Sequence, residues 1–148
     1  MRRYIIAAFT VLAVLAAIGA LTVSSNAWAA SSVVNVKMWN NGPKMALKLD
    51  KNTVPAGKVT FKGTNTSTDG TVHEMLVIKV DTKLPNLPYN EDTGLVPEDK
   101  INSLGEISEV EAGKKGKLTL NMKPGIYLLF CNQPGHFAAH MEALFFVK

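Results

Sequence analysis

A cluster of potential metal ligands lies near the end of this 148-residue chain. Cys131 is followed five positions later by His136, beyond a Pro134-Gly135 turn, and Met141 follows after another five. A loop between two adjacent strands can therefore direct a thiolate, an imidazole and a thioether toward one point. Two imidazoles and a thiolate in a trigonal plane, with a distant methionine on the axis, form a type 1 copper site. The segment predicts such a site, provided that a second histidine is supplied.

The second histidine has to come from another part of the fold. Of the three histidines only His73 lies outside this loop, early in the largely apolar run Thr71–Val80. That run is typical of a strand, and it follows a turn rich in Asn, Ser, Thr and Gly. His73 and Cys131 each stand at a strand end, so we expect both at one pole of a sandwich.

The rest of the chain predicts an all-β fold. Short apolar or alternating runs are separated by turn residues, which favours an antiparallel sandwich or barrel. The expected strands are Val33–Trp39, Lys44–Asp50, Lys58–Thr64, Thr71–Val80, Lys117–Met122, Ile126–Cys131 and Met141–Val147.

One segment, Pro85–Gly113, departs from this pattern. It carries seven acidic residues against the single Lys100, together with three prolines. We expect a long acidic loop with one short helix near Pro97–Leu104. Such a charge run is either a solvated loop or a surface for a partner.

The N-terminal segment has the layout of an export signal. Arg2-Arg3 precede an uncharged apolar run from Tyr4 to Val23, and Ala27-Trp28-Ala29 follows. This order predicts a signal peptide over 1–29 and a single functional domain over 30–148. The apolar run is also long enough to span a bilayer, so an uncleaved membrane anchor is the alternative. Either way the domain is expected to be periplasmic or otherwise extracytoplasmic.

Composition excludes several other classes of protein. The net charge of +4 and the lack of a dense Lys/Arg stripe argue against nucleic-acid binding. A single cysteine excludes an internal disulfide and a Cys-x-x-Cys metal or redox site. No nucleotide-binding or hydrolase motif occurs, and no pair of acidic residues stands out as a catalytic couple.

On these residues the chain resembles the cupredoxins of the plastocyanin/azurin group. The similarity is carried by Val54–Val59, His73-Glu74-Met75, Lys123–Tyr127 and the loop from Pro134 to Met141. The resemblance implies a Greek-key β-sandwich and one type 1 copper ion. It implies His73, Cys131, His136 and Met141 as the copper ligands. It also implies one-electron transfer, without an enzymatic reaction.

Two positions depart from the family pattern. Glu74 stands where many members have Asn, whose side chain ties the two ligand loops together, so another bond has to do this here. His140 stands where a glycine often precedes the axial methionine, and a side chain there can alter the loop or offer a competing imidazole.

The residues around His136 are small or apolar, which suggests that a redox partner docks there weakly. A cytochrome, an oxidase or a copper reductase would each fit. Lysines around the pole or the acidic segment would orient the partner.

Three other functions remain open at this stage. A copper-binding, delivery or resistance protein could use the same ligands. A nitrite reductase or multicopper oxidase would need more than three histidines for its further copper sites. A plain adhesion sandwich would leave the Cys, His and Met spacing unexplained.

Overall fold

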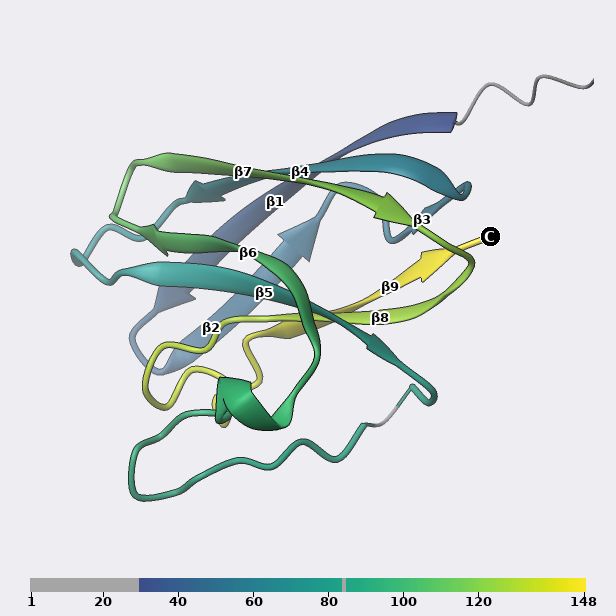
Figure 1. Ribbon diagram of the computed structural model, residues 1–148. Coiled ribbons are helices and arrows are strands. Elements are labelled where there is room, and N and C mark those ends of the chain that lie inside the picture. The colour runs from purple at the N-terminus through teal and green to yellow at the C-terminus, as the bar shows by residue number, and fades with distance from the viewer. Residues whose placement is uncertain (1–29, 84) are drawn as a thin grey trace, which may run out of the picture.

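The computed structural model describes residues 30–83 and 85–148, which form two stacked sheets (Figure 1). The predicted signal segment 1–29 lies outside the described residues. One sheet has the order β2-β1-β4-β7, formed by Lys44–Leu49, Ala30–Asn41, Gly57–Asn65 and Lys115–Met122. The other has the order β3-β9-β8-β5-β6, formed by Thr53–Val54, Glu142–Val147, Gly125–Phe130, His73–Val80 and Ser103–Val110. We call them sheet A and sheet B.

The expected all-β sandwich is confirmed, but the sheets are mixed and not purely antiparallel. β1 pairs with β4 in parallel, and β3 pairs with β9 in parallel, while the other neighbours are antiparallel. Both parallel pairs join strands that are not consecutive in the chain, since β2 and β3 lie between β1 and β4, and β4 to β8 lie between β3 and β9.

Alternation along the strands builds the core between the sheets. Val34, Val36 and Met38 of β1 are at most 1% exposed, whereas Asn35 and Lys37 between them are exposed. They pack with an aromatic pair, Phe61 of β4 and Phe145 of β9, whose ring centroids are 5.2 Å apart. Burial of this apolar surface is the main stabilising contribution.

A second, smaller core lies on the outer face of sheet B. Leu76, Ile78, Leu128 and Phe130 of β5 and β8 pack there against Val96 from the acidic segment. This covering explains why β5 has a continuous apolar run from Met75 to Ile78, since both faces of the strand are buried.

The acidic segment is only partly the loop that the sequence predicts. Its short helix is present as η1, a single 3₁₀ turn over Glu98–Lys100. The expectation of an unbroken connection from Pro85 to Gly113 is wrong, because β6 (Ser103–Val110) pairs with β5. β6 is an edge strand in which only Ile107 and Val110 are buried, so its acidic residues conceal the strand pattern.

The strands bring the start of β5, the end of β1 and the β8–β9 loop to one pole of the sandwich, as Figure 1 shows. Within residues 30–83 and 85–148 no helix has the length and apolar character needed to cross a bilayer.

Candidate metal centre

Three of the residues singled out in the sequence converge at this pole. His73 at the start of β5, Cys131 directly after β8, and His136 in the following loop have ligand atoms within 4.8 Å of one another. The His136 Nδ1 atom lies 3.2 Å from His73 Nδ1 and 3.3 Å from Cys131 Sγ, and His73 Nδ1 lies 3.9 Å from the sulfur. The side chains of His73 and Cys131 are fully buried and His136 is 8% exposed.

The donor set fits one metal ion. Metal–nitrogen and metal–sulfur bonds of roughly 2.0–2.3 Å let a single ion reach donor atoms separated by up to about 4 Å. Both histidines turn Nδ1 toward the sulfur, so two imidazole nitrogens and one thiolate can face a common centre. With Met141 beside them, these residues make up the donor set of a type 1 copper site.

The orientation of His73 is set by a hydrogen-bond relay that the sequence did not reveal. His73 Nε2 lies 3.3 Å from the Asn40 Oδ1 atom at the end of β1. The Asn40 amide nitrogen in turn donates to the Asp69 carboxylate over 2.7 Å. Since Asn40 Oδ1 can only accept, the proton of the ring sits on Nε2 and leaves the Nδ1 lone pair free for a metal.

The Cys131 sulfur receives backbone hydrogen bonds inside an apolar setting. The Glu74 backbone N–H donates to Sγ over 3.4 Å. Burial raises the pKa of the Cys131 thiol to about 11, while the backbone amides of Glu74 and Gln133 act in the opposite direction. Without a cation the thiol therefore keeps its proton at neutral pH, and a bound metal is what would favour the thiolate.

The two histidines are held neutral in the metal-free protein. Burial lowers the pKa of His73 to about 4, and the neighbouring His136 adds to this effect. Burial also lowers the pKa of His136. Neutral imidazole is the form that binds metals.

Glu74 connects the two ligand-bearing segments. Its backbone bonds the Cys131 sulfur, and its side chain accepts a hydrogen bond from Gln133 in the loop after β8. Burial, with repulsion from Glu106, Glu98 and Glu109, raises the pKa of Glu74 to about 7. Glu74 therefore connects the same two segments that Asn is expected to connect at this position, but through different hydrogen bonds.

Backbone hydrogen bonds fix the loop from Cys131 to Met141. The Cys131 N–H donates to the Met141 carbonyl over 3.0 Å, and the Met141 N–H donates to the His136 carbonyl over 3.0 Å. The side chain of Met141 is fully buried in the main core. Met141 is therefore attached by its backbone to two of the other predicted ligands.

His140 keeps the conformation for which glycine is favoured. Its φ is +59°, in the left-handed region, and its side chain is exposed. The loop therefore turns as it would with glycine, at a cost of roughly 1–2 kcal/mol in backbone strain. The imidazole of His140 is not in the cluster formed by His73, Cys131 and His136.

Part of the acidic segment is attached to the ligand loop. The Asn132 side chain accepts a hydrogen bond from the Val96 N–H over 2.8 Å and donates to the Val96 carbonyl over 3.0 Å. The Gly135 N–H donates to the Gly94 carbonyl over 2.8 Å. Phe137 packs against Phe130, with ring centroids 5.4 Å apart, and lies 6.1 Å from Tyr89.

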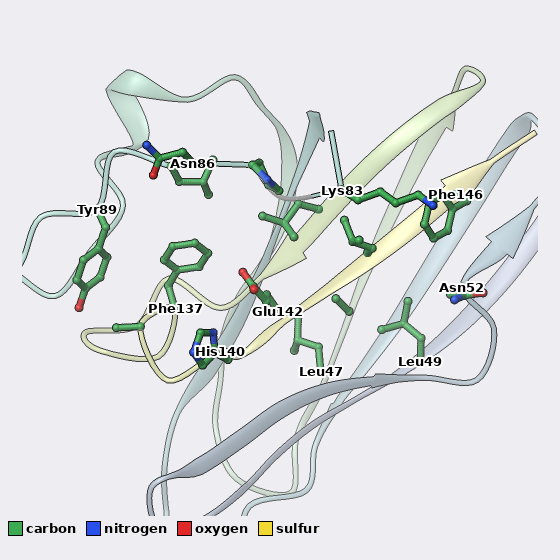
Figure 2. A pocket seen from close by; sticks show the side chains of 16 residues that line it. Leu47, Leu49, Asn52, Lys83, Asn86, Tyr89, Phe137, His140, Glu142 and Phe146 are labelled. Atoms are coloured by element: carbon green, nitrogen blue, oxygen red, sulfur yellow. The ribbon is translucent and has the colours of Figure 1, made fainter. Parts of the chain in front are cut away.

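A cleft of about 1030 Å³ lies beside this loop, between β2, β9 and residues 85–89. Figure 2 shows Tyr89, Phe137 and His140 at one end of the cleft and Phe146 at the other. None of the four predicted ligands lines it. The cleft and the metal centre are therefore separate features.

Solved structures with the same fold include several copper proteins. Auracyanin from Roseiflexus castenholzii matches with a TM-score of 0.60 and 21% identity, over 81% of this chain and 98% of its own. Auracyanin A from Chloroflexus aurantiacus, a "blue" copper protein, matches with a TM-score of 0.58 and 20% identity, over 80% and 100%. Rusticyanin from Thiobacillus ferrooxidans matches with a TM-score of 0.56 and 23% identity, over 80% and 77%. No family model and no curated protein sequence matches the chain.

Proposed function

We propose that this chain, which has the cupredoxin fold, is an exported type 1 copper protein that carries single electrons between redox partners. The observation that carries the proposal is the convergence of His73, Cys131 and His136 at one buried pole, with Met141 in the same loop. Copper bound there would supply reversible one-electron chemistry between its two common oxidation states.

The residues around the centre favour electron transfer because they hold the donors rigidly. His73 is fixed by Asn40, the Cys131 sulfur by the Glu74 amide, and the ligand loop by its internal hydrogen bonds. Ligands that cannot move keep one arrangement in both oxidation states, so little reorganisation accompanies each transfer.

Burial also favours a carrier over an enzyme or a delivery protein. The sulfur and the ring of His73 have no exposed surface, and the neighbouring cleft does not reach the predicted ligands. A substrate in that cleft would not touch the metal. A copper-delivery protein needs accessible ligands for exchange, and these ligands are shielded.

Electrons would enter and leave through His136, which is 8% exposed. Pro134 and Ala138 beside it are exposed, and Phe137 is half-buried. This small apolar surface would give a redox partner, such as a cytochrome, an oxidase or a reductase, a weak and short-lived contact. An exported location is consistent with the signal-like sequence of residues 1–29.

Visible and paramagnetic resonance spectra of the protein with one equivalent of copper test the proposal. An intense blue absorption and a narrow copper hyperfine splitting are expected. The Cys131→Ser variant should lose the blue band because the thiolate is gone, whereas His140→Gln, the matched control in the same loop, should keep it. A pale wild-type protein that quickly gives its copper to a chelator would instead support the delivery function.

A further inference from the structure

Sheet A has an outer face that is strongly basic. Its four strands contain one lysine in β1 and two each in β2, β4 and β7, and no acidic residue, while the single carboxylate of Asp50, directly after β2, accepts hydrogen bonds from Asn35 of β1. All seven of these lysines are exposed. Each stands at an outward position of its strand, so their charges share one face.

Strand pairing brings these lysines side by side. Lys37 of β1 is the register partner of Lys48 of β2, and Lys62 of β4 is the partner of Lys117 of β7. Like charges directly opposite each other on adjacent strands are destabilising. The sheet has one such pair between β1 and β2 and another between β4 and β7, and packing of the core does not require either.

The same face also carries apolar surface. Val33 is 39% exposed and lies on the same outward face of β1 as Lys37 and Trp39. Trp39 is half-buried, and the Lys48 ammonium lies 4.0 Å from the centroid of its ring. Lysine and tryptophan together are typical of the interface between a membrane and water, where the amine reaches headgroups and the ring sits at the boundary.

The opposite side of the sandwich has the opposite charge. The segment Pro85–Gly113 has seven acidic residues against one lysine, and part of it covers the outer face of sheet B. An anionic surface would therefore attract sheet A and repel the other side, which gives the molecule a defined orientation.

We propose that the outer face of sheet A docks on a bilayer that contains anionic lipids. Charge complementarity supports this partner, and so does the sequence that precedes the sheet. The uncharged apolar run Tyr4–Val23 ends seven positions before β1 begins at Ala30. Wherever that run remains attached and inserted, sheet A is held close to the headgroups. Each lysine near an anionic leaflet adds to this attraction.

Lysine acylation of the full chain reconstituted into nanodiscs tests this docking. The rate of modification at each lysine is read by mass spectrometry in neutral discs and in discs with anionic phosphatidylglycerol. Lys37, Lys62 and Lys117 should react at least threefold more slowly in the anionic discs, and high salt should remove the difference. Lys100 and Lys83, which lie on the side of sheet B, should react equally in both.

A charge-reversal pair with a matched control adds a second readout. The K62E/K117E double variant should lose the protection of Lys37, whereas K83E/K100E, with the same change in net charge on the other side of the molecule, should retain it. Equal acylation of wild-type sheet A in both kinds of disc would overturn the proposal even if a variant failed to fold. Protection of the face by added DNA but not by anionic discs would overturn it in favour of another polyanion.

Discussion

At the metal centre the orientation of one ligand depends on a single amide side chain. Asn40 accepts a hydrogen bond from His73 Nε2 and passes the interaction on to the exposed Asp69. Partners of this kind fix the tautomer of a metal-binding histidine and raise its basicity, and their loss typically costs 10–100-fold in metal affinity.

Replacement of Asn40 by Ala should therefore weaken copper binding about tenfold. The neighbouring, exposed Asn41→Ala is the matched control and should leave affinity unchanged. Nitrogen NMR of the metal-free protein provides a readout that does not depend on copper. The His73 ring should be a single Nε2–H tautomer in the wild type and a mixture in N40A. A single tautomer in both proteins would show that Asn40 does not position the ring.

Glu74 gives the metal-free protein a pH dependence of its own. Its folded-state pKa of about 7 lies above the ordinary value of 4.5, so the folded state holds this proton more tightly than the unfolded state does. The stabilising contribution is complete below about pH 4.5 and is lost as the pH rises through 7. Above pH 7 a charged carboxylate has to be kept buried.

Glu74→Gln should consequently stabilise the metal-free protein at pH 8, by about 1–3 kcal/mol, and have little effect near pH 4. Denaturant unfolding at the two pH values measures the free energy of unfolding. Glu111 is exposed, so Glu111→Gln is the control, and its effect on the free energy of unfolding should be the same at both pH values. A stabilisation by E74Q that is equal at both pH values would contradict the assignment.

The ligand residues of the site could be predicted from the sequence, but the hydrogen-bond partners that orient them could not. Cys131, His136 and Met141 could be found because they share one loop with regular spacing. Asn40 could not, because it lies 33 positions from His73 and an asparagine at a strand end is an ordinary turn residue. The burial of Glu74 was equally hidden, since an isolated glutamate is usually exposed.

At the scale of elements, the ligand loop depends on a close contact with the acidic segment. Gly94 has a φ of +71°, and a side-chain carbon there would lie 2.8 Å from the Gly135 nitrogen and 3.3 Å from Pro134 Cα. A methyl group would therefore displace the ligand loop and break the bond between Gly135 N–H and the Gly94 carbonyl.

Gly94→Ala should destabilise the protein and also shift its reduction potential. Gly113→Ala is a matched control, because Gly113 has a similar φ of +77° but open space around the added carbon. Both variants carry the backbone cost of roughly 1–2 kcal/mol, but only G94A should change the potential and the blue band. Voltammetry of the two copper-loaded variants separates the effects. An unchanged potential in G94A would mean that the segment does not constrain the loop.

Element prediction succeeded where one face of a strand is apolar and failed where it is not. β1 and β5 were found from alternation or from a continuous apolar run. β6 was missed because only Ile107 and Val110 are buried, and its other positions are mostly glutamate, serine and glycine. The two-residue β3 is too short for any periodicity, and it is defined only by its pairing with Phe146 and Val147.

Over the whole molecule, charge is separated between the two sides of the sandwich. The net charge is +4, yet several acidic residues lie close enough to the metal centre to act on Glu74 beside it. Glu98, Glu106 and Glu109 all raise the pKa of Glu74, which shows that negative potential reaches the residue next to His73. The turn with Glu91 and Asp92 also leads into Gly94, which contacts the ligand loop.

This separation of charge predicts that the rate of reaction with small redox reagents depends on the charge near the metal centre and not on the net charge of the protein. A cationic cobalt(III) complex should oxidise the reduced protein at a rate that falls with ionic strength, whereas the ferricyanide rate should rise, because salt screens attraction in one case and repulsion in the other. Stopped-flow growth of the blue band measures both rates. Asp92→Asn should flatten both salt dependences, and Asp81→Asn, at the opposite end of β5 from His73, should leave them unchanged. If ferricyanide were instead the reagent slowed by salt, the positive net charge would govern the approach, and the acidic segment would have no part in guiding a partner to His136.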